Sequence, residues 1–255
     1  MISHDPRSLG GQTQPSPSLL YLPGIDGTGR LLFRQGRLRE KYRVECASYP
    51  QDQPRTYEQL ADDAALRIER LGAEPAVVVA ESFGGAVALT LALKRPELIA
   101  RLVLSNTFAF FPRRLIIGLG AAFGRFLPDW RAPIASRGIR GPAMFGLGVP
   151  REIRDEFFQQ SADVPMKICG DRLRMIAELD LRSRLPEIAI PALILIGTHD
   201  LVVAPEAGRE LARLLPFAHL IERPVGHVAL VHPCIDLLEL IEDPALWAEH
   251  SILEA

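Results

Sequence analysis

The stretch that most constrains the fold is an apolar run that turns into a helix within a few residues. Residues 76–80 read Ala-Val-Val-Val-Ala, which is typical of a strand buried on both faces of a sheet. The run stops at residues 81–85 (ESFGG), and apolar residues with helical spacing follow at once. A strand that becomes a helix so quickly must bend sharply, with small residues beside the apex. We therefore predict that Ser82 stands in strained backbone at this apex with its hydroxyl exposed.

Considered alone, this turn also fits two structures that carry out no catalysis. A serine after a strand is a common helix cap, and a glycine-rich turn can cradle a phosphate group. The first glycine of the usual nucleophile turn is replaced by Ala80. Alanine is the smallest residue with a side chain, so we expect the close approach of strand and helix to be kept. Other parts of the sequence must therefore decide whether Ser82 is a catalytic residue, a helix cap or part of a phosphate-binding loop.

Buried-type strands alternate with amphipathic helices on both sides of this stretch. The sequence predicts strands at residues 18–22, 42–47, 76–80, 99–105, 191–197 and 218–222. It predicts helices at residues 30–40, 56–71, 86–93, 205–215 and 231–241. Thr56 is the expected cap of the second helix, and Gly72 its stop signal. This order predicts an α/β fold with a doubly wound, mostly parallel sheet and helices on both faces.

The regular alternation is interrupted between residues 108 and 181. This part has helical pieces divided by prolines, the last at residues 164–179, and no convincing strand. We interpret residues 108–181 as a helical cap inserted into a core domain of residues 18–107 and 182–255. Residues 1–17 are rich in Gly, Ser, Gln and Pro, which predicts a flexible lead-in.

Net charge, cysteine content and the lengths of the apolar runs limit which partners and which cell compartment we expect. The formal net charge of −2 offers no electrostatic case for nucleic acid as the main partner. The three cysteines, Cys46, Cys169 and Cys234, lack metal-type spacing, and their odd number argues against a disulfide framework. The N-terminus lacks the apolar core of a signal peptide, and the longest central apolar run is too short to span a bilayer. We expect a soluble cytoplasmic protein that binds no metal; no oligomeric state follows from the sequence.

Four groups with the right chemistry are predicted at the carboxyl ends of strands, where open parallel sheets bind their ligands. They are Ser82, Asp200, His227 and the backbone N–H groups of the loop at Gly24-Ile25. Serine becomes a good nucleophile when histidine removes its proton, and a carboxylate fixes the histidine tautomer. Alone, Asp200 would be a turn residue and His227 a surface histidine. Together, in the order Ser, Asp, His, they predict a catalytic triad.

The glycine-rich loop at residues 24–29 (GIDGTG) faintly matches a nucleotide-binding loop. No Lys-Ser or Lys-Thr pair follows it, and the glycine spacing differs from that of the dinucleotide fingerprint. We therefore expect no nucleotide and no other cofactor. Asp26 is expected to brace its own loop through an Asx-turn, with substrate contact as the alternative.

Taken together, residues 18–250 resemble the α/β-hydrolase family. The stretch AESFG (residues 80–84) is similar to its nucleophile turn, Asp200 to its acid and His227 to its base. The stretches LPGIDGTG (residues 22–29) and ESFGG are similar to an acyltransferase-like branch that includes plant phytyl ester synthases.

The resemblance also implies an oxyanion hole and its supporting loop. The backbone N–H groups of Ile25 and Phe83 would hold the oxyanion, and Gly24, Asp26 and Gly84 would support them. Because backbone supplies these bonds, the side chains of Ile25 and Phe83 would be free to shape the pocket.

The function implied is a serine hydrolase that cleaves a small carboxylic ester or thioester through an acyl-enzyme. The predicted cap is rich in large apolar residues, which favours a lipophilic acyl group. Two alternatives stay open: an acyltransferase that passes the acyl group to an alcohol, and a receptor-like member of the family that binds a ligand with little turnover.

Overall fold

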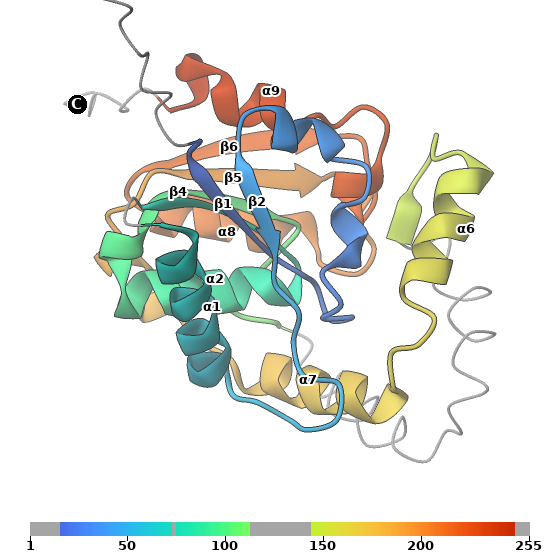
Figure 1. Cartoon of the computed structure of the whole chain (residues 1–255), viewed down its shortest axis with the longest axis horizontal. Helices are drawn as coiled ribbons and strands as arrows, with labels where there is room; N and C mark the ends of the chain where they lie inside the picture. Colours follow the sequence, from blue (N-terminus) through green and yellow to red (C-terminus); the bar gives the residue numbers. More distant parts are fainter. Residues whose placement is uncertain (1–15, 73–74, 113–143, 248–255) are drawn as a thin grey trace, which may run out of the picture.

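The computed structural model describes residues 16–72, 75–112 and 144–247. Six parallel strands form one sheet in the order β2-β1-β3-β4-β5-β6 (Figure 1). The strands are β1 (Ser18–Leu22), β2 (Arg43–Cys46), β3 (Ala76–Glu81), β4 (Ile99–Ser105), β5 (Ala192–Gly197) and β6 (Ala218–Arg223). The parallel sheet predicted from the sequence is confirmed, with every predicted strand present.

Helices cover both faces of this sheet, as a doubly wound fold requires. The α-helices are α1 (Tyr57–Leu71), α2 (Phe83–Lys94), α6 (Arg151–Gln160), α7 (Met166–Glu178), α8 (Pro205–Leu214) and α9 (Leu237–Glu242). Short 3-10 segments are η1 (Arg30–Leu32), η2 (Gly36–Glu40), η3 (Pro96–Leu98), η6 (Arg182–Glu187), η7 (Ala229–Val231) and η8 (Pro244–Leu246). Figure 1 shows α1 and α2 on one side of the sheet and α9 on the other.

The two faces of the sheet bury two separate apolar cores, because alternate residues of a strand point to opposite faces. Leu20 and Val78 pack in one core with apolar residues of α1, α2 and α8. Leu19 and Val77 pack in the other core with residues of η2, η7 and α9. The strands β1, β3 and β5 are therefore buried along their whole length, which is why they read as apolar runs in the sequence.

The described part of the predicted cap consists of α6, α7 and the segments around them. Phe157 of α6 packs with Leu31 and Val228 in a third apolar cluster, apart from the two main cores. Ile176 of α7 instead joins the core of the α1–α2 face. Residues 113–143 of the predicted cap and 1–15 of the predicted lead-in lie outside the described residues, so the domain boundaries stay a prediction.

Two helices differ from the sequence prediction, and each difference has a local cause. The single helix predicted at residues 30–40 is two 3-10 segments, because Gln35 between them leaves helical geometry, with φ −101° and ψ 35°. The last helix begins at Leu237 rather than residue 231. Pro233 forces His232 into an extended conformation, with φ −72° and ψ 136°.

None of the described helices is long and apolar enough to cross a membrane.

Gly84 allows α2 to approach the end of β1 closely, and this contact predicts a stability effect. A Cβ atom at Gly84 would lie 2.4 Å from the Leu22 carbonyl oxygen and 2.5 Å from that of Pro23. Since both obstacles are backbone, we expect Gly84→Ala to lower the free energy of unfolding by about 1–3 kcal/mol. Urea denaturation followed by circular dichroism measures this change.

The matched control is Gly36→Ala, since a Cβ at exposed Gly36 would meet no atom within 4 Å. An unfolding free energy equal for the two variants would contradict the close approach at Gly84.

Candidate active site

Ser82 lies at the apex of the turn between β3 and α2, with φ 50° and ψ −120°. A positive φ is unfavourable for a residue with a side chain, by about 1–2 kcal/mol. Hydrogen bonds hold the turn: the Ser82 N–H donates to Ser105 O at 3.0 Å, and Ser82 O accepts from Gly85 N at 3.0 Å. The Thr107 hydroxyl also donates to Ser82 O, at 2.5 Å. The turn predicted from the sequence is present, with Ser82 at its apex.

The small residues beside this turn are needed for close packing. A Cβ atom at Gly85 would lie 2.1 Å from the Thr107 hydroxyl oxygen. Ala80, which replaces the usual first glycine, is fully buried in the sheet and packs in the α1–α2 core. The alanine side chain therefore fits, as expected from its size.

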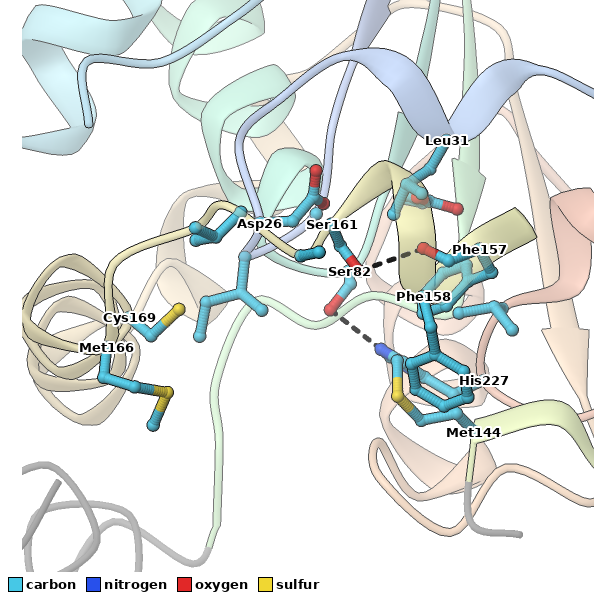
Figure 2. Close-up of a pocket in the computed structure, with 16 residues that line it drawn as sticks. Asp26, Leu31, Ser82, Met144, Phe157, Phe158, Ser161, Met166, Cys169 and His227 are labelled. Carbon is cyan, nitrogen blue, oxygen red and sulfur yellow. Dashed lines mark hydrogen bonds between the residues drawn. The ribbon is translucent and has the colours of Figure 1, made fainter. Parts of the chain in front are cut away.

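The three predicted triad residues meet at the carboxyl edge of the sheet. His227 Nε2 lies 3.0 Å from Ser82 Oγ, and His227 Nδ1 lies 2.8 Å from Asp200 Oδ2. Figure 2 shows His227 pointing toward Ser82. Asp200 and His227 are buried, so their contact is shielded from solvent. The tautomer with its proton on Nδ1 would donate to Asp200 and leave Nε2 able to accept the serine proton.

Asp200 is fixed by its own turn as well as by the histidine. Its Oδ1 atom accepts hydrogen bonds from the backbone N–H groups of Val202 at 2.7 Å and Val203 at 2.9 Å. The turn contacts and the contact with His227 are thus made by different oxygens of one carboxylate.

Asn106 is a positioning residue that no sequence motif indicated. It follows β4 and has a positive φ of 45°, a conformation that asparagine tolerates better than most residues. Its amide nitrogen donates to the carbonyl oxygens of Gly226 at 3.0 Å and His227 at 2.6 Å. Its amide oxygen accepts from the Gly197 N–H at 2.7 Å. One buried side chain therefore ties the ends of β4 and β5 to the loop that carries His227.

The loop after β1 lies beside Ser82 and is braced internally. A Cβ atom at Gly24 would lie 3.7 Å from Ser82 Cβ, which places the loop in contact with the serine. Gly27 N donates to Gly24 O at 3.0 Å and closes a tight turn. Asp26 Oδ2 accepts from the Thr28 N–H at 2.8 Å and the Thr28 hydroxyl at 2.5 Å. The Asx-turn expected at Asp26 is present.

Two backbone N–H groups are available beside Ser82. Among the described residues, neither Ile25 N nor Phe83 N donates a hydrogen bond to another group of the chain. Phe83 is the first residue of α2, where the helix dipole favours negative charge. Ile25 and Phe83 thus have unpaired N–H groups beside the serine, as the predicted oxyanion hole requires.

The side chain of Phe83 does not shape the pocket, in contrast to the sequence expectation. It is fully buried in the core. Its ring stacks on Tyr57 with a centroid distance of 5.1 Å and meets the edge of Tyr49 at 5.7 Å. The helix turns the Phe83 ring toward the core, whereas Ile25 lines the cleft.

An apolar cleft with an empty volume of about 960 Å³ opens over Ser82 and His227. Figure 2 shows side chains from α6, the segment after it and α7 surrounding the serine. The apolar lining comes from Ile25, Leu31, Met144, Phe157, Phe158, Ala162, Val164, Met166 and Val228. Its charged lining consists of Asp26 and Glu81, and no lysine or arginine lines it among the described residues.

Glu81, directly before the serine, is a buried acid to which the sequence motifs assigned no role. Burial raises the pKa of Glu81 to about 7, and the charge of Asp26 acts in the same direction. The Tyr21 hydroxyl donates to Glu81 Oε1 at 2.6 Å and opposes part of this rise. The buried Glu81 side chain at the end of β3 is thus held in place by a hydrogen bond from Tyr21.

Asp180, Asp236 and His199 do not line the cleft over Ser82. Asp180 pairs with Arg182 at 2.7 Å, Asp236 caps α9, and His199 is exposed. Among the described residues, no three His, Cys, Asp or Glu side chains lie together in a way that could hold a metal ion.

Known proteins resemble the chain over most of its length. The sequence profile described as the alpha/beta hydrolase family matches residues 19–240. Pimeloyl-[acyl-carrier protein] methyl ester esterase of Aromatoleum aromaticum is 30% identical over 184 residues, which covers 67% of this chain and 74% of the esterase.

A second relative matches over a shorter stretch. Phytyl ester synthase 2, chloroplastic, of Arabidopsis thaliana is 36% identical over 106 residues, which covers 40% of this chain. The match spans 15% of that longer protein. Among solved structures, a hydrolase from Pseudomonas aeruginosa PA01 shares the fold with a TM-score of 0.75 and 24% identity, covering 85% of this chain and 84% of that one.

The raised pKa of Glu81 predicts a pH-dependent stability. The pKa lies above its ordinary value of 4.5, so the protonated native form is favoured, and this stabilisation is lost as the pH rises toward about 7. Glu81→Gln keeps an acceptor for Tyr21 but cannot ionise. We expect the free energy of unfolding of the variant, relative to that of the wild type, to increase by up to about 3 kcal/mol as the pH rises from 4.5 to 8.

Denaturation curves measured across this pH range test the expectation. The control is Glu152→Gln, because Glu152 is exposed on α6. A difference between wild type and Glu81→Gln that does not change with pH would show that Glu81 ionises normally.

Proposed function

The chain belongs to the alpha/beta hydrolase family, and from this premise we propose that it is a serine hydrolase that cleaves a carboxylic ester or thioester. The observation that carries the proposal is the chain of contacts from Asp200 through His227 to Ser82. The similarity to a methyl ester esterase supports the same class of reaction.

In the proposed mechanism, His227 Nε2 takes the proton of Ser82 as the serine oxygen attacks the carbonyl carbon. The N–H groups of Ile25 and Phe83 hold the resulting oxyanion. His227 then gives its proton to the leaving oxygen or sulfur, the bond to the leaving group breaks, and an acyl-enzyme remains. Water, deprotonated by His227, releases the acid and restores Ser82.

The lining of the cleft supports a neutral, lipophilic acyl group. The side chains of Leu31, Phe157 and Val164 offer apolar contact along the cleft. A terminal carboxylate on the acyl chain would find no lysine or arginine among the described lining residues, which include the acids Asp26 and Glu81. Desolvating an unpaired carboxylate is unfavourable, so a charged acyl group is disfavoured.

Acyl transfer to an alcohol is the second candidate, favoured by the 36% identity to a phytyl ester synthase over 106 residues. It would use the same acyl-enzyme, with an alcohol in place of water. Adding a long-chain alcohol to the ester assay and measuring the new ester by mass spectrometry separates the two. An intact contact between Ser82 and His227 argues against a receptor that only binds its ligand.

Ser82→Ala should abolish turnover, since the proposed acyl-enzyme forms on the Ser82 oxygen beside His227. We expect kcat on p-nitrophenyl butyrate to fall by about 10⁴-fold or more, together with loss of the burst of nitrophenol. Ser161→Ala is the control, because its hydroxyl lines the same cleft but donates to Phe157 O at 3.0 Å. Turnover that survives in the Ser82 variant would refute the mechanism.

The apolar lining predicts a preference among acyl chains. For neutral p-nitrophenyl esters from butyrate to decanoate, we expect kcat/KM to rise by up to about fourfold per added methylene, as each buried CH₂ contributes about 0.8 kcal/mol. An ester whose chain ends in a carboxylate should react at least about tenfold more slowly than its neutral methyl-capped analogue. A preference for the charged ester would contradict the proposed acyl class.

A further inference from the structure

Arg172 is a buried cation that the proposed mechanism does not yet use. It lies on α7, in the described part of the predicted cap, and only 4% of its surface is exposed. Burial lowers the pKa of its guanidinium group. Among the described residues no carboxylate pairs with it, so its charge is balanced by backbone dipoles instead. Since burying an unpaired charge is unfavourable, such an arrangement needs a compensating set of contacts.

These contacts are with the loop that carries Ile25. Arg172 Nη1 donates to Ile25 O at 2.7 Å and to Asp26 O at 2.9 Å. Arg172 Nη2 donates to Pro50 O at 2.9 Å, in the segment that follows β2. The guanidinium carbon also lies 5.6 Å from the centre of the Tyr49 ring, within range of a cation–π contact.

The loop is shaped to accept this guanidinium group. A Cβ atom at Gly27 would lie 2.7 Å from both Arg172 Nη1 and Nη2, so no larger residue fits there while the arginine keeps its place. Gly27 has a positive φ of 64°, which also favours glycine. The loop conformation and the position of the cation are therefore matched to each other.

The other carbonyl groups of the loop are also held in place. Tyr49 Oη donates to Pro23 O at 3.1 Å, and Tyr49 N donates to Gly27 O at 2.8 Å. Gly24 O accepts from Gly27 N at 3.0 Å. With Arg172 on the two carbonyls between, every carbonyl from residue 23 to 27 has a donor. The Ile25 N–H donates to no group of the described chain, so it can serve a ligand.

We propose that Arg172 is a positioning residue for the oxyanion hole, because it holds the Ile25 and Asp26 carbonyls and thereby aims the Ile25 N–H at the reacting carbonyl oxygen. The inference rests on the proposed function. It also joins α7 to the catalytic centre, since any shift of this helix moves the donor. A donor held in advance stabilises the transition state, in which the negative charge is largest, more than the bound ester.

Arg172→Met tests this role, because methionine keeps much of the apolar stem and removes all of the donors. We expect kcat on a neutral p-nitrophenyl ester to fall by about 10- to 100-fold, with KM changed by less than about threefold. Affinity for a boronic acid, which forms a tetrahedral adduct on Ser82, should fall in parallel with kcat/KM. Arg172→Lys, which can reach fewer carbonyls, should lie between wild type and Arg172→Met.

The matched control is Arg174→Met on the same helix. Arg174 is exposed and contacts Asp171 at 3.3 Å, so its loss should leave kcat and boronate affinity unchanged. Equal kcat and boronate affinity in the Arg172→Met and Arg174→Met variants would overturn the inference. If Arg172→Met does not fold, Arg172→Lys decides in the same way, provided that its thermal unfolding shows a folded protein.

Hydrogen exchange of the peptide covering residues 22–28 separates this inference from the proposed function. We expect faster exchange in this peptide for Arg172→Met than for wild type or Arg174→Met. If the wild type cleaves no ester but exchange still depends on Arg172, the proposed function fails and the loop contact stands. If the wild type cleaves esters and exchange is the same in all three proteins, the positioning role fails alone.

Discussion

Ser82 keeps its positive φ because both of its neighbouring elements are buried and cannot move to relieve it. β3 before it is buried along its whole length, and α2 after it begins in the core. Ser82 is bonded at its N–H to Ser105 and at its carbonyl to Gly85 and Thr107. The same turn brings the start of α2 against the loop after β1, where a side chain at position 84 would strike backbone. The positions of Ser82 and of the two N–H groups proposed as oxyanion donors thus depend on one local conformation.

The parts of the fold that could be predicted from the sequence are those encoded by local chemistry. Strands buried on both faces appear as apolar runs, so β1, β3 and β5 could be located directly in the sequence. Because parallel strands share one carboxyl edge, the residues following three of them had to be near neighbours. The proximity of Ser82, Asp200 and His227 could therefore be predicted, although they lie far apart in the chain. Their catalytic roles remain a proposal.

The contacts that escaped prediction depend on distances that no local pattern carries. Asn106 follows a strand like many polar residues, and nothing near it in the sequence indicates that its amide reaches both Gly197 and His227. In the sequence, Arg172 looks like any polar residue of an amphipathic helix. Its partners Asp26 and Ile25 nevertheless lie 146 and 147 positions away. An asparagine next to a buried strand, a residue type that tolerates left-handed backbone, is the signal that would have drawn attention to position 106. No such signal marks position 172.

The contacts of Gln35 join the beginning of the described chain to its end. Its amide nitrogen donates to Leu230 O at 2.7 Å and Ile235 O at 3.0 Å, and its oxygen accepts from Leu237 N at 2.9 Å. The same early segment forms ion pairs with α9 through Arg37 and Lys41.

These long-range contacts have a consequence for synthesis of the chain on the ribosome. The face of the sheet covered by η2 and α9 cannot be closed until the last of these residues has left the ribosome. Until then Leu19, Val77 and Leu193 lack part of their apolar cover. The nascent chain therefore exposes this apolar face of the sheet until α9 has emerged, and a chaperone that binds apolar surface has access to it during that interval.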